Sequence, residues 1–327
     1  MLLWTRDPAQ AERIATTREN ARYLAGVRSP EGVTVTADLE RAAACPALIV
    51  ATPAAGVVAL RDRLAPQLHP EHLLLSATKG LDPDGGRRMS ELWAELVPLT
   101  RIAALSGPNI SREIAAGLPA PTVVASVAPG TAKWFQSLVG TPMFRVYTNE
   151  DVVGVELCGA LKNVIAIGAG AIDGIGYGGN AKAGFMTRGL AEIARFAFAH
   201  GANPLTAAGL AGIGDLITTC ASPLSRNRTV GELLAAGLDS DSIRARLGGQ
   251  VAEGIGTTAV VVAAARARGI AMPVAEATHR VLFDGLPVRE AMRELMQREP
   301  GEELAGPLAD LSRLLTGLRE DGPTPPR

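Results

Sequence analysis

Two lysines stand where the sequence predicts chemistry, and the first is Lys162. It lies within the predicted helix 151–172, which is apolar on nearly every side and is therefore expected to be buried. None of the residues one helical turn away from Lys162 can pair with an ammonium group. A buried lysine needs a partner across a cleft, and burial lowers its pKa towards values useful for proton transfer. We expect Lys162 to exchange a proton with a substrate; the alternative is a surface lysine with only its stem buried.

Lysine is scarce in this chain, and that scarcity singles out the second residue. Only four of the 32 basic residues are lysines: Lys79, Lys133, Lys162 and Lys182. A lysine that arginine has not replaced is a candidate for a site that needs a compact, titratable cation. Lys79 follows the apolar run 73–77, so it is expected at the carboxyl end of a strand, where α/β domains bind ligands. Lys133 and Lys182 lie in polar or turn-like segments and could be there by chance.

A third set of polar residues follows the next predicted strand. Ser106-Gly107-Pro108-Asn109 ends that strand and opens a helix, with Ser111 in its first turn. Small residues and exposed amides at a helix start suit an anion or a ligand rich in hydroxyl groups. The same residues are also ordinary turn and cap residues, so the pattern alone is a modest indication.

Further along the chain, Gly212-Ile213-Gly214-Asp215 leads to Thr219, and Ser225-Arg226-Asn227-Arg228 precedes a helical segment. Arg226 together with helix-start amides could clamp a phosphate. A solvated helix start with flanking arginines is the alternative. Asp215 is either a helix cap or a carboxylate that orients Lys162, and the spacing does not decide between them.

The elements that must position these residues fall into two groups. Predicted strands at 2–5, 47–52, 73–77, 102–106, 122–126 and 144–148 alternate with predicted helices at 54–64, 89–96, 110–116 and 132–138. This alternation predicts a doubly wound, Rossmann-like α/β domain with a mostly parallel sheet over residues 1–149. Helical segments at 151–172, 182–200, 256–268, 273–283 and 288–297 predict an all-α domain over 150–320, helical again at 308–318, with a tail at 321–327. The site is expected in the cleft between the two domains.

Composition excludes several classes of protein. The chain has 327 residues, 47% of them hydrophobic, which is enough for two domains with their own hydrophobic cores. Its net charge of −1 argues against a nucleic-acid partner. Cys45, Cys158 and Cys220 form no close pair, so neither a disulfide framework nor a zinc site is expected. No metal site, signal peptide or membrane span is predicted, and a cytoplasmic protein is expected.

One expected feature of a dinucleotide-binding domain is missing. Its first strand normally runs into a G-x-G-x-x-G turn, but here the first strand-like run ends in Thr5-Arg6-Asp7 and resembles a second strand. We expect a strand, turn and helix of about 30 residues upstream, with Met1 a misassigned start and two strand edges left unpaired. The formal match at residues 174–179 follows a helix and is interpreted as an interhelical turn that lines a pocket.

Taken together, the motifs resemble the bacterial NAD(P)-dependent glycerol-3-phosphate dehydrogenase family. They occur in the family's order over essentially the whole chain. The matching segments are Leu3-Trp4-Thr5-Arg6-Asp7-Pro8, Ala77-Thr78-Lys79-Gly80-Leu81, Ser106-Gly107-Pro108-Asn109, Gly154-Val155-Glu156-Leu157, Leu161-Lys162-Asn163-Val164-Ile165-Ala166, Gly212-Ile213-Gly214-Asp215-Leu216, Ser225-Arg226-Asn227-Arg228 and Val251-Ala252-Glu253-Gly254.

The resemblance implies hydride transfer between a nicotinamide and C2 of dihydroxyacetone phosphate or sn-glycerol 3-phosphate, in the supply of phospholipid backbones. Lys162 would donate and accept the proton at the C2 oxygen, Lys79 would polarise the substrate, and Asp215 would interact with both Lys162 and the substrate. The implied substrate-binding residues are Lys79, Gly107, Asn109, Lys162, Asn163, Asp215, Thr219, Ser225, Arg226 and Asn227. Those implied for the dinucleotide are Arg6, Tyr23, Lys79, Ser111, Arg226, Val251 and Glu253.

The cofactor is expected to be NADP or NAD. Arg6 at a strand end leaves room for a 2′-phosphate and favours NADPH, although the neighbouring Asp7 weakens that preference. Two other functions stay open: a noncatalytic phosphate-metabolite binder that holds no dinucleotide, and a dehydrogenase of another phosphorylated or hydroxy-acid substrate. The phosphate-suited Ser225-Arg226-Asn227 disfavours the second of these. A homodimer also stays open.

Overall fold

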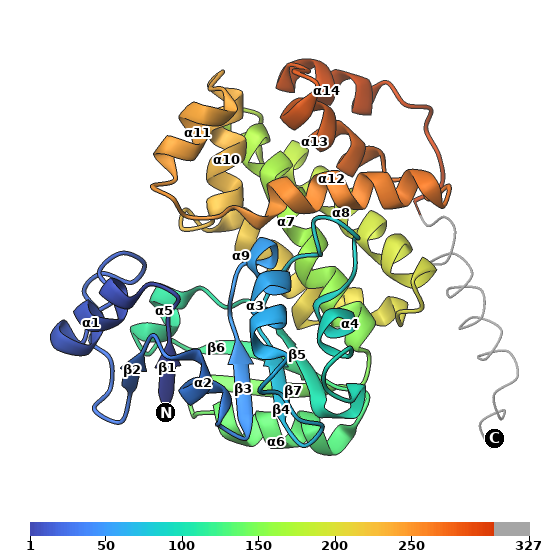
Figure 1. The fold of residues 1–327 in the computed structure, drawn as a ribbon. Coiled ribbons are helices and arrows are strands. Elements are labelled where there is room, and N and C mark those ends of the chain that lie inside the picture. Colours follow the sequence, from blue (N-terminus) through green and yellow to red (C-terminus); the bar gives the residue numbers. More distant parts are fainter. Residues whose placement is uncertain (304–327) are drawn as a thin grey trace, which may run out of the picture.

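A computed structural model describes residues 1–303, which form an α/β domain followed by a helical domain (Figure 1). The strands of the first domain are β1 (Leu2–Trp4), β2 (Thr34–Thr36), β3 (Ala47–Val50), β4 (Leu73–Ser76), β5 (Ile102–Ser106), β6 (Ala120–Ala125) and β7 (Phe144–Asn149). Its α-helices are α1 (Pro8–Thr17), α2 (Leu39–Ala43), α3 (Val57–Leu64), α4 (Met89–Trp93), α5 (Ser111–Ala115) and α6 (Pro129–Val139). Two 3₁₀ turns, η1 (Ala54–Gly56) and η2 (Leu99–Arg101), precede α3 and β5.

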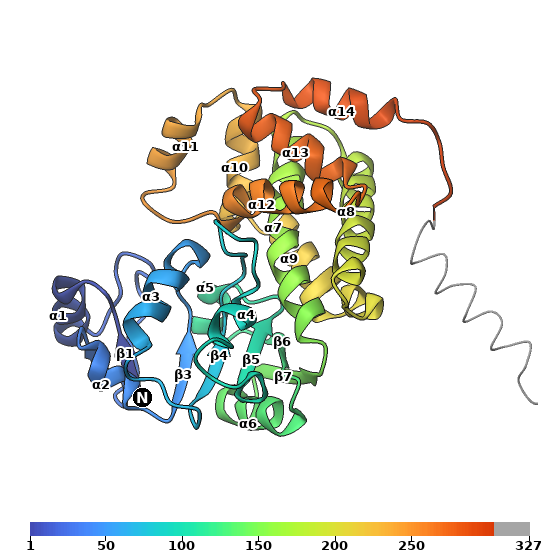
Figure 2. The same ribbon diagram turned by 45° about the vertical axis from the view of Figure 1, so that its right-hand side comes forward.

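The strands form two sheets rather than one. β3, β4, β5, β6 and β7 lie in that order, with only the β5–β6 pair antiparallel, and β1 pairs with β2 in a separate parallel sheet. Among residues 1–303, β1 has no neighbour besides β2 and β3 has none besides β4, so each has a free edge, as the sequence predicts. Figure 2 shows the small sheet beside the β3 side of the large one.

Both faces of the large sheet are covered at its inner strands, which explains why β4 and β5 are almost entirely apolar. Leu74 of β4 packs with α3 and α4 on one face, whereas the next residue, Leu75, packs with Phe135 of α6 on the other. Successive side chains of a strand point to opposite faces, so one continuous apolar run serves both layers. The mostly parallel, doubly wound domain predicted from the sequence is confirmed.

The helical domain is built around α7 (Val152–Gly174), which other helices enclose (Figures 1 and 2). By length and composition α7 could span a membrane, but 83% of its most apolar window is buried inside the protein, as in a core helix. The other helices are α8 (Gly179–Ala199), η3 (Pro204–Ala208), η4 (Leu210–Gly214), α9 (Asp215–Ala221), α10 (Arg226–Ala235), α11 (Ser240–Arg246), α12 (Glu253–Ala267), α13 (Pro273–Phe283) and α14 (Val288–Met296).

Glycines let α7 and α10 approach each other very closely. A Cβ at Gly231 of α10 would overlap the carbonyl oxygen of Ile167 in α7, and a Cβ at Gly170 would overlap the carbonyl oxygen of Arg228. No larger residue fits at either point without moving a backbone. This contact fixes α10, and with it Arg226 and Asn227, against the helix that carries Lys162.

Several elements differ from the sequence-based expectation. The short strand β2 and the helices α1, α2, α9 and α11 were not predicted, because they are short or lack a clear apolar period. The formal glycine-loop match lies at the junction of α7 and α8, where Gly176 has φ +76°, and so contributes to an interhelical turn as predicted. The predicted helix 308–318, the end of the predicted second domain and the tail 321–327 lie outside the described residues.

Candidate active site

Lys162 is buried, and its partners lie on another helix of the same domain rather than across the cleft. It is 6% exposed, and its Nζ donates to Asp215 Oδ1 at 2.9 Å and to Thr219 Oγ1 at 2.6 Å. Asp215 and Thr219 are one turn apart on α9, so the helix presents both oxygens to the same ammonium group. The buried setting and the need for a distant partner predicted for Lys162 are both found.

Lys79 reaches the same carboxylate from the α/β domain. Its Nζ donates to Asp215 Oδ2 at 2.7 Å and to the Gly107 carbonyl oxygen at 2.7 Å. Gly107 has φ +139°, a conformation that favours glycine, and a Cβ there would come within 3.0 Å of Thr122 Cα. Asp215 therefore holds two ammonium groups, one from each domain, and is more than a helix cap.

Burial and charge set the protonation of this cluster. Burial, and secondarily the nearby Lys79, lowers the pKa of Lys162 to about 8, although Asp215 acts in the opposite direction. For Asp215 burial acts to raise the pKa, but Lys79 and Lys162 outweigh it and hold the pKa below its usual value. The cluster thus keeps a permanent carboxylate beside an amine that can lose its proton near neutral pH, as proton transfer to or from an oxygen requires.

Two asparagines named as substrate ligands are bonded to each other. Asn227 Nδ2 donates to Asn163 Oδ1 at 2.8 Å, and Asn163 Nδ2 donates to the Lys79 carbonyl oxygen at 3.1 Å. Asn227 Oδ1 in turn accepts from the Gly254 amide at 3.0 Å. This chain of amides connects α12, α10 and α7 to the loop that carries Lys79, so both asparagines fix the shape of the site.

The start of α10 adjoins this chain. Ser225 caps the helix through a bond from the Arg228 amide to its Oγ at 3.3 Å, while Arg226 is exposed. A capped helix start beside an exposed guanidinium can accept a phosphate. Asn109, at the end of β5, accepts from Thr122 Oγ1 at 3.1 Å, and its buried Nδ2 has no partner among the described residues.

Of the residues named for the dinucleotide, only Lys79 belongs to the lysine cluster. Arg6, Tyr23 and Val251 are exposed, as is Ser111 at the start of α5. Arg22 stacks its guanidinium over Tyr23, 5.2 Å from the ring centroid, and its Nη2 lies 3.2 Å from where a Gly249 Cβ would stand. The loop that carries Tyr23 therefore lies close to the loop that carries Val251, and both of these side chains are exposed.

Sequence analysis missed some residues that shape the site. Lys182, set aside as a chance lysine, pairs with Asp173 at 2.6 Å, and Arg228 pairs with the same carboxylate at 2.9 Å. The scarcity of lysine was the available signal for it. Gly159 was also missed: a Cβ there would overlap Ser106 Oγ, so only glycine lets α7 lie this close to β5.

Comparisons with known proteins support one family. Residues 1–132 match the model of the NAD-dependent glycerol-3-phosphate dehydrogenase N-terminus, and residues 151–293 match that of the C-terminus. A glycerol-3-phosphate dehydrogenase (NAD(P)+) of Parafrankia sp. is 47% identical over 304 residues, 92% of this chain and 91% of the relative. One of Chlorobium phaeobacteroides is 43% identical over 309 residues, 93% and 92% of the two chains.

The fold comparison agrees. The crystal structure of the glycerol-3-phosphate dehydrogenase of Coxiella burnetii superposes with a TM-score of 0.87 at 34% identity, covering 91% of each chain. Both the α/β domain and the helical domain are thus those of this class of oxidoreductase, which uses NAD or NADP. The chain belongs to the family of NAD(P)-dependent glycerol-3-phosphate dehydrogenases.

Proposed function

We propose that the protein reduces dihydroxyacetone phosphate to sn-glycerol 3-phosphate, with Lys162 as the proton donor at the C2 oxygen. The observation that carries this proposal is the buried Lys162 ammonium, held by Asp215 and Thr219 with a pKa lowered to about 8. An amine with such a pKa can give a proton to a developing alkoxide and recover it from water. In the reverse direction the neutral amine accepts the proton of the alcohol.

Lys79 and Asp215 have separate tasks in this proposal. The Lys79 ammonium, 2.7 Å from Asp215, adds positive charge where the carbonyl oxygen becomes negative. Asp215 balances the two cations and keeps Lys162 oriented. Because both lysines share one carboxylate, both lie close to any oxygen bound beside it.

The start of α10 is proposed as the phosphate site. Ser225, Arg226 and Asn227 provide a capped helix start and an exposed guanidinium, while Asn163 supports them from α7. A guanidinium such as that of Arg226 can donate two hydrogen bonds to a phosphate, and the positive end of the helix dipole also favours this dianion. Gly107, Asn109 and Thr219 complete the proposed substrate site, and the unpartnered Asn109 Nδ2 offers a donor to it.

NADPH is the proposed cofactor. When bound, it supplies the hydride for the C2 carbon. Arg6 would favour a 2′-phosphate, Tyr23 and Val251 would hold the adenosine end, and Lys79, Ser111, Arg226 and Glu253 would line the remainder of the cleft. We also propose that the enzyme acts in the cytoplasm and supplies the backbone of phospholipids.

The test compares two lysine-to-arginine variants. Lys162→Arg keeps the charge but loses the titratable amine, so NADPH oxidation with dihydroxyacetone phosphate is expected to fall by about 10²–10⁴-fold in kcat. Lys133→Arg changes an exposed lysine on α6 and serves as the matched control, with wild-type turnover expected. Near-normal turnover by Lys162→Arg would refute the proton-transfer role, and binding without turnover by wild type would favour the noncatalytic binder.

A further inference from the structure

Glu253, the first residue of α12, makes a direct contact between the two domains. Its Oε1 accepts a hydrogen bond from the Ala54 amide at 3.0 Å, although the two residues are 199 positions apart. Burial raises the pKa of Glu253, whereas the Ala54 bond and the charge of Arg226 act to lower it. A half-buried carboxylate that spans two domains is costly unless it is bonded, which makes this contact specific.

The Ala54 amide is at a helix start that lacks a cap of its own. Ala54 opens η1, which leads directly into α3, and the preceding residue Pro53 makes no side-chain cap bond. The first amides of a helix need acceptors and carry its positive dipole end. Glu253 thus serves as the missing cap, supplied by the other domain.

The same carboxylate packs against the loop that carries Lys79. A Cβ at Gly80 would stand 3.1 Å from Glu253 Oε2 and 2.7 Å from Ala54 Cβ, so Gly80 packs closely against both residues. The adjacent Lys79 carbonyl oxygen is held by Asn163 at 3.1 Å. Asn163 also accepts a hydrogen bond from Asn227, and Asn227 accepts one from the Gly254 amide. Gly254 follows Glu253 in the first turn of α12.

We infer that Glu253 is a positioning residue: by capping the start of η1 across the domain boundary, it holds the Lys79 backbone where the Lys79 ammonium meets Asp215. The inference rests on the proposed site of Lys79 and Lys162 but adds a role for Glu253 that is independent of any bound dinucleotide. Without this cap, the Lys79–Gly80 segment loses its support from the helical domain's Glu253, while the bond from Asn163 remains. The ion pair between Lys79 and Asp215 would then be less populated, and the Lys79 amine would be more accessible to solvent.

The scarcity of lysine makes a direct test practicable. The protein without dinucleotide is labelled with an amine-specific reagent, and mass spectrometry follows Lys79, with Lys133 as an internal exposed reference. Glu253→Ala is expected to raise the Lys79 labelling rate at least about threefold and to speed hydrogen exchange in the peptide that contains Ala54. Glu253→Gln retains an acceptor oxygen, so both rates should stay near the wild-type values.

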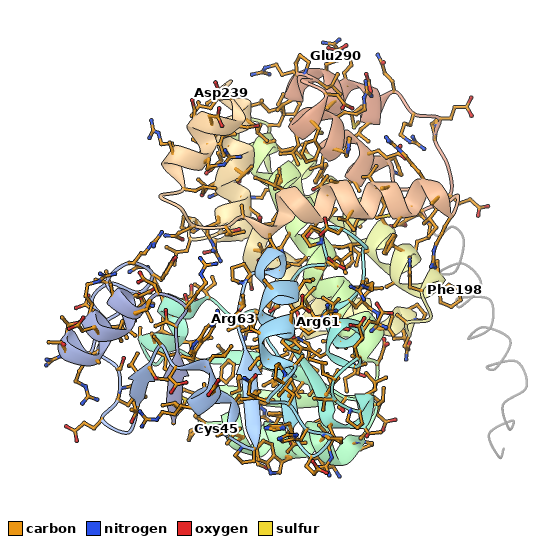
Figure 3. All side chains as sticks on the ribbon, viewed as in Figure 1. Cys45, Arg61, Arg63, Phe198, Asp239 and Glu290 are labelled. Atoms are coloured by element: carbon orange, nitrogen blue, oxygen red, sulfur yellow. The ribbon has the colours of Figure 1, made fainter. Side chains whose placement is uncertain are left out.

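The matched control and the shorter carboxylate sharpen the outcome. Glu290→Ala removes an exposed carboxylate from the first turn of α14. Figure 3 shows Glu290 at the end of the helical domain that is remote from Arg61 of α3. This variant should leave the Lys79 labelling rate unchanged. Glu253→Asp is one methylene too short and should behave like Glu253→Ala, which covers the case in which the alanine variant does not fold. Wild-type Lys79 labelling in both short variants, or an equal rise in Glu253→Gln, would overturn the inference. Since labelling needs no turnover, its failure is distinct from failure of the proposed reaction.

Discussion

At the scale of single residues, Asp215 holds two lysines at once, one with each carboxylate oxygen. Lys79 and Lys162 approach its two oxygens at 2.7 and 2.9 Å, and the carboxylate itself is 2% exposed. Each ammonium lowers the pKa of Asp215, while burial is the main reason that the pKa of Lys162 falls. The pKa values of both groups are therefore lowered: Asp215 stays ionised, and the Lys162 amine becomes titratable near neutral pH.

This arrangement predicts opposite pH profiles for the two directions of the reaction. In the proposed mechanism reduction needs Lys162 protonated, so its kcat/KM should fall about tenfold per pH unit above about pH 8. Oxidation needs the neutral amine, so its kcat/KM should rise with pH up to the same point and then level off. Steady-state rates between pH 6 and 10 check this, and a profile for reduction that is flat through pH 8 would contradict it.

At the scale of elements, helix starts and helix crossings hold the site. Glu192 of α8 accepts from the Val274 and Ala275 amides at the start of α13, and Glu156 of α7 accepts from the Ser90 amide in α4. Burial raises the pKa of both carboxyls, to about 7 for Glu192. Each is a side chain that caps a helix distant in sequence, as Glu253 does for η1, so these caps connect elements as well as ending them.

The crossing of α7 and α10 predicts a contrast between two glycine substitutions. Gly231→Ala should lower the thermal midpoint by several degrees, because the new Cβ would overlap the Ile167 carbonyl oxygen. Gly184→Ala in α8 is the control: nothing lies within 4 Å of its Cβ position, so it should be neutral or stabilise by up to about 1 kcal/mol. Calorimetry measures both. Equal midpoints for the two variants would show that the crossing is less tight than described.

At the scale of the whole molecule, the site exists only because two domains meet. Lys79 comes from the α/β domain, whereas Lys162, Asp215 and Thr219 come from the helical domain. The shared carboxylate is therefore also an interdomain contact, together with the bond between Glu253 and Ala54. The arrangement of the domains and the geometry of the proposed site depend on the same few groups.

Removing the shared charge should destabilise this interface. Asp215→Asn leaves two ammonium groups beside an uncharged amide, and the expected loss is roughly 3–5 kcal/mol of unfolding free energy. The double variant Asp215→Asn/Lys79→Met lacks one of those cations. Its loss of unfolding free energy should be smaller, by at least about 1 kcal/mol, than the sum of the losses in the two single variants. Denaturant unfolding of the four proteins gives this coupling. Strict additivity would mean that Lys79 and Asp215 do not interact.

The sequence by itself determined the division into an α/β domain and a helical domain, the buried setting of Lys162 and the place of Lys79 at a strand end. Local pattern and residue type carry that information, because apolar period and strand-end position are properties of neighbouring residues. Short elements such as β2 and α11 have too little pattern to be predicted. Only the tertiary structure decided the role of Asp215, left open between cap and orienting carboxylate, and the partners of Lys182, Asn163 and Glu253. These depend on contacts between residues 9 to 199 positions apart, which form only when the helices pack and the domains meet.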